Sequence, residues 1–335
     1  MAHQELPQGR KKATTLRSWL PDWRLLLLLS PGRPGAAGVV TGVLLALLLL
    51  GSCTNVRPTH KIGLLAPFEG LHRRSGYAAL SAVRAAIADF PSAQAGILPL
   101  ALDDGGQPQT ARAAARKLLV DARLVAVVGP LSPDLSAAAQ PLLDAAGIWW
   151  SPPYALVGEQ WAAGLVAAAA AQARQDGAAG LVLAGWTPGW PALDAAAWTA
   201  IADLPVRLLD DPEGVGANEA VFWLGSPDAG AAYLVQLRRA HPLSLFVMGP
   251  AGEDPVFAER AGSLHRVYWT IWTDDGYNRW TASHDNPSPN AYLVYRTTLA
   301  ALAAATGVSS ASPPTSWTVQ TFRYDAQGSW TPALP

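Results

Sequence analysis

Cys53 is the residue whose chemistry the sequence isolates most clearly, because it is the only cysteine among 335 residues. It ends an apolar run, residues 43–50, that is followed by the small residues Gly51 and Ser52. A single thiol can form no disulfide within the chain and no thiolate cluster for a metal. Cys53 stands where this apolar segment meets the rest of the chain.

The segment that ends at Cys53 resembles a bacterial lipoprotein signal with its lipobox. Six basic residues precede the apolar core, which is the order expected of a secretory signal. In that family the peptide is cut before the cysteine, which is then acylated. The resemblance implies a signal peptide over residues 1–52, a short tether over 53–60 and a chain held by lipid outside the cell membrane. The alternative is an uncleaved anchor helix over about residues 35–50, which is short for a membrane span.

Enzyme and metal-site signatures are missing from the sequence. It contains no His-Glu-x-x-His, no Gly-x-Ser-x-Gly, no phosphate-binding loop and no Cys/His cluster, and its six histidines are scattered. The paired carboxylates Asp103 and Asp104 precede Pro108, where turn formation and capping explain them better than acid/base chemistry. We therefore expect a protein that is not an enzyme and uses no metal or cofactor, and a hydrolase is the weakest hypothesis.

Charge limits the class of partner. The first 52 residues carry six of the 24 Lys and Arg residues and two of the 25 Asp and Glu residues, which leaves 18 basic against 23 acidic residues in the remainder. The remainder has no basic run, and this argues against nucleic acid as a partner. It also has no apolar run long enough to span a bilayer.

Short β-like runs alternate with longer Ala-rich helical runs from Lys61 onward. Strands are predicted over residues 62–66, 97–102, 124–128, 148–150, 181–184, 206–209, 220–224, 245–248 and 267–270. Helices are predicted over residues 75–89, 109–121, 134–146, 158–175, 191–201, 227–240 and 255–261. Strands that are apolar on both faces and alternate with helices indicate parallel sheets covered on both sides. We expect two such sheets, because about ten strands are many for one doubly wound sheet.

Three dipeptides support the predicted helix starts. Ser132-Pro133, Ser226-Pro227 and Asp254-Pro255 each place a capping oxygen before a proline at the first helical position. The end of the chain is expected to contain a loop, a last helix and a hairpin. The predicted ranges are 283–290 for the loop, 292–305 for the helix, and 319–324 with 329–331 for the hairpin.

From about Lys61 to Trp330 the chain resembles the type I periplasmic binding proteins, the group that includes leucine/isoleucine/valine-binding and amide-binding receptors of ABC importers. The motifs that carry the resemblance are residues 62–67 (IGLLAP), 103–108 (DDGGQP), 110–118 (TARAAARKL), 125–132 (VAVVGPLS), 246–250 (FVMGP) and 322–328 (FRYDAQG). The implied fold is α/β, with two doubly wound parallel-sheet lobes joined by a hinge. The implied lobes are residues 61–155 with about 275–312, and residues 156–274 with about 313–335. The second half is expected to be trimmed, because the Ser/Pro-rich residues 307–316 stand where the family has another helix.

The resemblance implies an extracytoplasmic, monomeric solute-binding lipoprotein. It would close on a small molecule, which is amino-acid-like, an amide or aromatic, and deliver it to an ABC permease. The alternative of the same fold is a sensor or interaction module with a degenerate cleft and no role in transport.

Ligands of open α/β sheets bind at the carboxyl ends of strands, and this principle selects the candidate contacts. The predicted ligand-binding residues are Phe68, Glu69, Ser132, Ser151, Tyr154, Trp186, Trp190 and Glu253. Ser132 has two interpretations, as the cap of the following helix or as a hydroxyl that binds a ligand carboxylate.

The predicted site departs from the amino-acid receptors in the loop after residue 150. Where the family often has Ser-Pro-x-Ala-Thr, Pro153 lacks a donor N–H and Ala155 lacks a hydroxyl. Fourteen tryptophans, several of them near predicted strand ends, either fill the core or form an aromatic wall for a flat, apolar or cationic ligand. The complete amino-acid clamp is therefore not expected.

Overall fold

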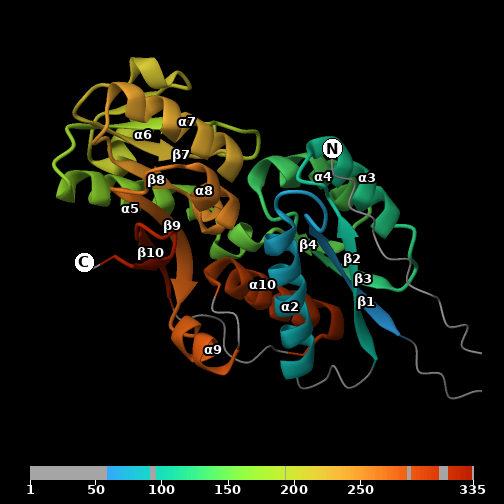
Figure 1. The fold of residues 1–335 in the computed structure, drawn as a ribbon. Coiled ribbons are helices and arrows are strands. Elements are labelled where there is room, and N and C mark those ends of the chain that lie inside the picture. The colour runs from blue at the N-terminus through green and yellow to red at the C-terminus, as the bar shows by residue number, and fades with distance from the viewer. Residues whose placement is uncertain (1–58, 91–95, 193, 285–287, 309–315, 334–335) are drawn as a thin grey trace, which may run out of the picture. The chain divides into compact units, whose positions relative to one another are not determined.

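The computed structural model describes residues 59–90, 96–192, 194–284, 288–308 and 316–333. Cys53 and the predicted signal peptide lie outside these ranges. The described chain falls within one compact unit, Arg57–Pro335. It contains two sheets, which confirms the predicted α/β fold class (Figure 1). None of the helices in the described ranges combines the length and the hydropathy needed to cross a bilayer.

The first sheet has four parallel strands in the order β2-β1-β3-β4. The strands are β1 (His60–Ala66), β2 (Ile97–Asp103), β3 (Leu124–Val128) and β4 (Trp149–Ser151). Alternate residues of β1 are buried on opposite faces. Ile62 and Leu64 pack toward helices α2 (Arg73–Asp89) and α10 (Pro289–Thr306). Leu65 packs toward helices α3 (Pro108–Leu118) and α4 (Pro133–Ala145). We call this sheet with its four helices lobe 1.

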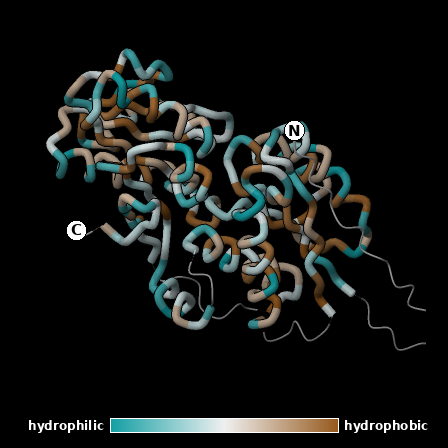
Figure 2. Tube along the Cα trace, in the orientation of Figure 1, coloured by the Kyte–Doolittle hydropathy of each residue, from teal (hydrophilic) through white to brown (hydrophobic). Residues whose placement is uncertain are grey.

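The second sheet has seven strands in the order β11-β10-β9-β8-β7-β5-β6. The strands are β5 (Gly180–Ala184), β6 (Val206–Leu208), β7 (Glu219–Trp223), β8 (Phe246–Met248), β9 (Val267–Asp274), β10 (Trp317–Tyr324) and β11 (Trp330–Pro332). Its helices are α5 (Trp161–Gln175), α6 (Ala195–Ala202), α7 (Pro227–Ala240) and α8 (Pro255–Arg260). Helices α5 and α6 pack on one face and α7 and α8 on the other, so hydrophobic residues concentrate between layers (Figure 2). We call this sheet with its four helices lobe 2.

The predicted helix starts are confirmed, but two of the three capping side chains do not cap. Proline opens α4, α7 and α8 as the sequence predicts. Only Asp254 bonds to its helix, where its Oδ1 accepts a hydrogen bond from the Val256 amide at 3.0 Å. The Ser132 hydroxyl instead donates to Asp134 Oδ1 at 2.6 Å. Proline with its fixed φ is enough to start these helices.

Two elements near the carboxyl end differ from the prediction. The predicted loop 283–290 contains the start of α10, because Ser288 caps it by accepting a hydrogen bond from the Ala291 amide at 3.0 Å. Strand β9 continues to Asp274, beyond the predicted range, because it pairs over its length with the antiparallel strand β10. The second sheet is therefore mixed at one edge and not wholly parallel.

The chain passes between the lobes after β4, after β9 and before β10. At the end of β9, the Asp274 carboxylate forms an ion pair with Arg296 of α10, with 3.0 Å between Nη1 and Oδ2. It also accepts hydrogen bonds from the Tyr292 hydroxyl and the Gly276 amide. The Asp274 side chain is 2% exposed, so the ion pair and these hydrogen bonds offset the cost of burying it.

Replacing Arg296 by leucine should lower the free energy of unfolding by about 3 kcal/mol, because a buried carboxylate then loses its counter-charge. Denaturant unfolding of residues 57–335 measures the change. The control is Arg207→Leu, which breaks the more exposed pair of Arg207 with Glu219 and should cost less than about 1 kcal/mol. Equal losses in the two variants would contradict the role given to the Asp274 pair.

Candidate functional site

A cavity of about 810 Å³ opens between the two lobes. Its lining comes mainly from loops that follow the carboxyl ends of β1, β3, β4, β5, β7 and β8, together with the starts of α2, α5 and α10. Both sheets therefore direct the same end toward one space, as expected for a ligand site in open α/β sheets. The volume lies within the range of ordinary small-molecule sites.

Aromatic rings form one wall of the cavity. Tyr154 lies against Trp161 with 4.5 Å between ring centroids, and Trp161 lies 4.7 Å from Trp190. Trp186 continues the row at 6.3 Å from Trp190. Burial raises the pKa of the Tyr154 hydroxyl to about 12. This wall is therefore apolar, and its only ionisable side chain stays neutral at physiological pH.

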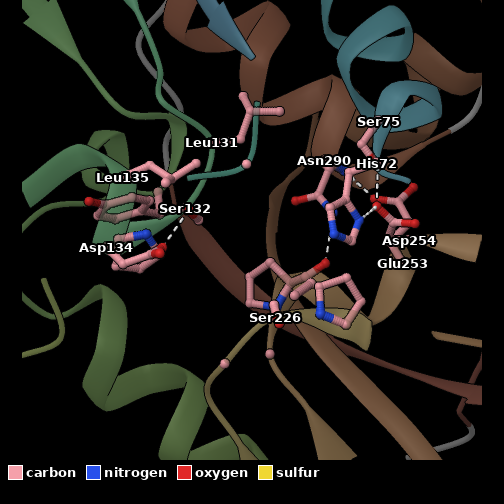
Figure 3. Close-up of a pocket in the computed structure, with 18 of the residues that line it drawn as sticks. His72, Ser75, Leu131, Ser132, Asp134, Leu135, Ser226, Glu253, Asp254 and Asn290 are labelled. Carbon is pink, nitrogen blue, oxygen red and sulfur yellow. Dashed lines mark hydrogen bonds and ion pairs between the residues drawn. The ribbon is translucent and has the colours of Figure 1, made fainter. Parts of the chain in front are cut away.

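The start of α4 brings a carboxylate to the same part of the cavity. Ser132, Asp134 and Leu135 all line it (Figure 3). The loop that carries Trp186 and Trp190 touches this helix start, because a Cβ on Gly189 would lie 2.1 Å from the Pro133 carbonyl oxygen. Gly189 has φ of +97°, so both its backbone and its surroundings require glycine.

The opposite side of the cavity is held by a hydrogen-bonded group that joins the lobes. His72, which precedes α2, lies with Nδ1 3.0 Å from Asp254 Oδ2, and the Ser75 hydroxyl donates to the same oxygen at 2.9 Å (Figure 3). His72 Nε2 is 3.6 Å from Asp228 Oδ1. The hydrogen bond to Asp254 raises the pKa of His72 above its ordinary 6.5, although burial opposes this.

A second charged contact, in which the cavity-lining Arg74 takes part, joins the same helices nearer the solvent. Arg74 Nη1 donates to Glu259 Oε1 at 2.6 Å, between side chains that are both more than half exposed. Helices α2 and α8 therefore face each other across the lobe boundary with complementary charges. In solvent this pair contributes little, so the half-buried group around Asp254 is the stronger link.

Glu253 lines the cavity but serves the start of α10. Its Oε2 accepts a hydrogen bond from the Asn290 amide at 2.8 Å, and Asn290 Nδ2 donates to the Pro250 carbonyl at 2.8 Å. Burial raises the pKa of Glu253 to about 7. A carboxylate at a helix N-terminus is favourable, and this contact links lobe 2 to α10.

Five of the eight predicted site residues line the cavity: Ser132, Tyr154, Trp186, Trp190 and Glu253. The other three, Phe68, Glu69 and Ser151, do not. The amides of Phe68 and Glu69 donate to Asp103 Oδ1 at 2.6 and 3.2 Å, and the Ser151 hydroxyl donates to the Pro152 carbonyl at 3.0 Å. Their polar groups are thus engaged in shaping their own loops.

The sequence did not single out His72, Ser75 or Trp161 as site residues. His72 and Ser75 lie at the start of a predicted helix, and a polar residue there reads as an ordinary cap or surface position. Trp161 falls inside a predicted helix. His72 and Ser75 become site residues only because α2 contacts α8. Trp161 becomes one only because α5 begins at the cavity. Neither contact can be read from the sequence around these residues.

Asp103 and Asp104 form turns, as predicted. Asp104 Oδ1 accepts a hydrogen bond from the Gly106 amide at 3.0 Å, and burial raises the pKa of Asp104 to about 6. Asp103 orders the loop after β1. No three His, Cys, Asp or Glu side chains of the described ranges gather in a way that could hold a metal ion.

Replacing His72 by glutamine should destabilise the protein more at about pH 6 than at about pH 9. The pKa of His72 is raised in the folded state, so its contribution is complete below its ordinary pKa and is lost as pH rises through the raised value. Denaturant unfolding at both pH values measures it. The control Ser75→Ala removes an uncharged donor to the same oxygen and should cost the same at each pH. A loss in His72→Gln that does not change with pH would contradict the charged pair.

Comparison with known proteins agrees with this geometry. The family model described as periplasmic binding protein matches residues 59–200. A search of curated proteins gives no match. The proteins that this family model describes are ligand-binding proteins.

Solved structures of binding proteins share the fold. The substrate-binding protein of a branched-chain amino acid transporter from Streptococcus pneumoniae, in complex with isoleucine, is 15% identical, with 83% of this chain and 100% of that chain covered and a TM-score of 0.59. A leucine-binding protein from Thermotoga maritima is 14% identical, with 82% and 98% covered and a TM-score of 0.65. A solute-binding protein from Rhodopseudomonas palustris, in complex with 4-hydroxybenzoate, is 14% identical, with 75% and 82% covered and a TM-score of 0.56. The chain thus has the fold of the type I periplasmic binding proteins, and its residues 59–200 match that family.

Proposed function

We propose that this protein is an extracytoplasmic solute-binding lipoprotein, which binds a small organic molecule between its lobes and delivers it to an ABC importer. The observation that carries the proposal is the cavity of about 810 Å³, whose walls come from both lobes at the carboxyl ends of their strands. The solved relatives in complex with isoleucine and 4-hydroxybenzoate favour a small solute with an apolar body.

Closure of the lobes is the mechanism that the contacts support. The link of His72 to Asp254 and the approach of Gly189 to Pro133 both join the lobes beside the cavity. A ligand shifts the equilibrium toward the state in which these contacts are formed only if it binds that state more tightly than the open one. Ligand contacts from both lobes would supply that difference.

Within the cavity we assign ligand contact first to Ser132, Tyr154, Trp186 and Trp190. Tyr154 and Ser132 come from lobe 1 or its exit, and the two tryptophans come from the loop after β5. Glu253 borders the ligand space while its carboxylate holds α10. The predicted lobe boundaries and the monomeric state remain predictions.

Lipid attachment at Cys53 is the second part of the proposal, and it rests on the sequence before residue 54. Mass spectrometry of the mature protein from cells should give an N-terminus at an acylated Cys53. Cys53→Ser should leave the leader uncleaved and the protein without acyl chains. An intact Met1 on the wild-type protein would contradict the lipoprotein assignment.

The solute-binding role is tested by a thermal-shift screen of residues 57–335 against amino acids, amides, aromatic acids, amines and sugars. One class should raise the melting temperature in a saturable way, because a ligand at about one hundred times its Kd stabilises the folded state by about 2.7 kcal/mol. A flat response across the panel from folded protein would contradict solute binding and favour the interaction module.

Closure is tested by Gly189→Ala with the ligand found in that screen. A methyl group at Gly189 meets the Pro133 carbonyl, so this variant should bind more than about tenfold more weakly, because the closed state is disfavoured. The matched control is Gly177→Ala. Gly177 also has a positive φ, +78°, but a Cβ there meets nothing within 4 Å. Equal affinities in the two variants would contradict closure through this contact.

A further inference from the structure

The charges of the cavity limit what its ligand can be, and this inference rests on the proposed solute-binding function. Among the described lining residues the basic side chains are His72 and Arg74. Each already faces acids of lobe 2. His72 lies between Asp254 and Asp228, and Arg74 is paired with Glu259. Every basic side chain of the described lining therefore already has an acidic partner, and none is left to pair with a carboxylate on a ligand.

The start of α4 cannot replace the missing counter-charge. A helix N-terminus attracts anions, but the first turn of α4 carries its own carboxylate, Asp134. The Ser132 hydroxyl, which could have bound a ligand carboxylate, donates to Asp134 Oδ1 at 2.6 Å. No described residue binds the other oxygen of Asp134. This corner of the cavity thus presents negative charge to a ligand.

The aromatic wall lies beside that carboxylate. The tryptophan loop touches Pro133, the residue before Asp134, at Gly189. The charge of Asp134 also adds to the effect of burial in raising the pKa of Tyr154. The faces of indole and phenol rings attract cations, most strongly when water is excluded, and tryptophan is the best of them. Trp161 and Trp190 are 8% and 7% exposed.

We propose that the cleft binds a small organic cation that lacks a carboxylate, with its ammonium group held by the rings of Tyr154, Trp161 and Trp190 and by the carboxylate of Asp134. The aromatic rings pack against the alkyl groups around the nitrogen, and their faces attract its positive charge. Asp134 supplies the full negative charge that the rings lack. A zwitterionic amino acid gains the same contacts at its amine but places its carboxylate beside Asp134.

The wall also carries a donor without a partner. The indole Nε1 of Trp190 is buried and has no hydrogen-bond partner among the described residues. A buried donor left unpaired is costly, so a hydroxyl or carbonyl oxygen on the ligand is favoured at this end of the cavity. An amino alcohol combines such an oxygen with the cationic group.

Calorimetric titration of residues 57–335 with choline and with its neutral isostere, in which a quaternary carbon replaces the nitrogen, tests the proposal. The two probes have nearly the same shape, so their difference reports the charge. Choline should bind more than about tenfold more tightly. Isoleucine and benzoate are titrated in parallel as probes that carry a carboxylate, and a panel of sugars and amides is added.

Two acids of α4 provide matched variants. Asp134→Asn should weaken choline binding by about tenfold and leave the neutral isostere unchanged. Asp144→Asn is the control, because Asp144 ends the same helix and bonds to Trp150 Nε1, away from the cavity. Trp161→Leu should weaken choline more than Trp161→Phe does, since phenylalanine keeps a ring. Melting curves show that each variant is folded.

Each result decides the inference. Equal binding of choline and its isostere, or an unchanged affinity in Asp134→Asn, overturns the assigned cation site. Binding of a carboxylate probe without binding of choline overturns the ligand class and leaves the solute-binding function in place. Failure of every probe in the panel, with folded protein, overturns the function as well.

Discussion

The carboxylate of Asp254 is the group through which the two lobes are joined beside the cavity. One oxygen caps α8 in lobe 2, and the other receives His72 and Ser75 from lobe 1. Burial alone would raise the pKa of Asp254, but these three hydrogen bonds outweigh burial and lower it. A single buried charge therefore fixes a helix start and joins the lobes. His72 stands at the N-terminus of α2, where a positive charge is unfavourable, so it gains from an acid of the other lobe.

The pairing of His72 and Arg74 with acids of lobe 2 determines which charges remain in the cavity. Because the basic groups of the described lining are engaged between the lobes, the aromatic rings and carboxylates of the lining are left facing the cavity. The loop after β4 reinforces this, since its prolines supply no amide to bind an anion. Two of the predicted contact residues thus serve the protein's own structure. Ser132 bonds to Asp134, and Glu253 bonds to α10.

Much of the fold could be predicted because its signals are local. Strand β3 and helix α7 begin and end where hydrophobic runs and a Ser-Pro pair place them. The start of α10 was missed although Ser288-Pro289 repeats the same pattern, because the flanking polar residues read as a loop. The length of β9 was missed because it depends on pairing with β10, a contact between segments far apart in sequence.

The site was less predictable for the same physical reason. A rule about strand ends selects loops, and the loops of Tyr154, Trp186 and Trp190 that it selected line the cavity. The rule cannot predict which polar groups of a loop remain free to bind a ligand, because this depends on hydrogen bonds within the protein. The amides of Phe68 and Glu69, for example, donate to Asp103. Nor can the rule find His72, whose partner Asp254 is 182 residues away. In a two-lobed protein, the residues that join the lobes beside the cleft depend on which residues face them from the opposite lobe. Local sequence can therefore identify the walls of the cleft, but not the contacts between those walls.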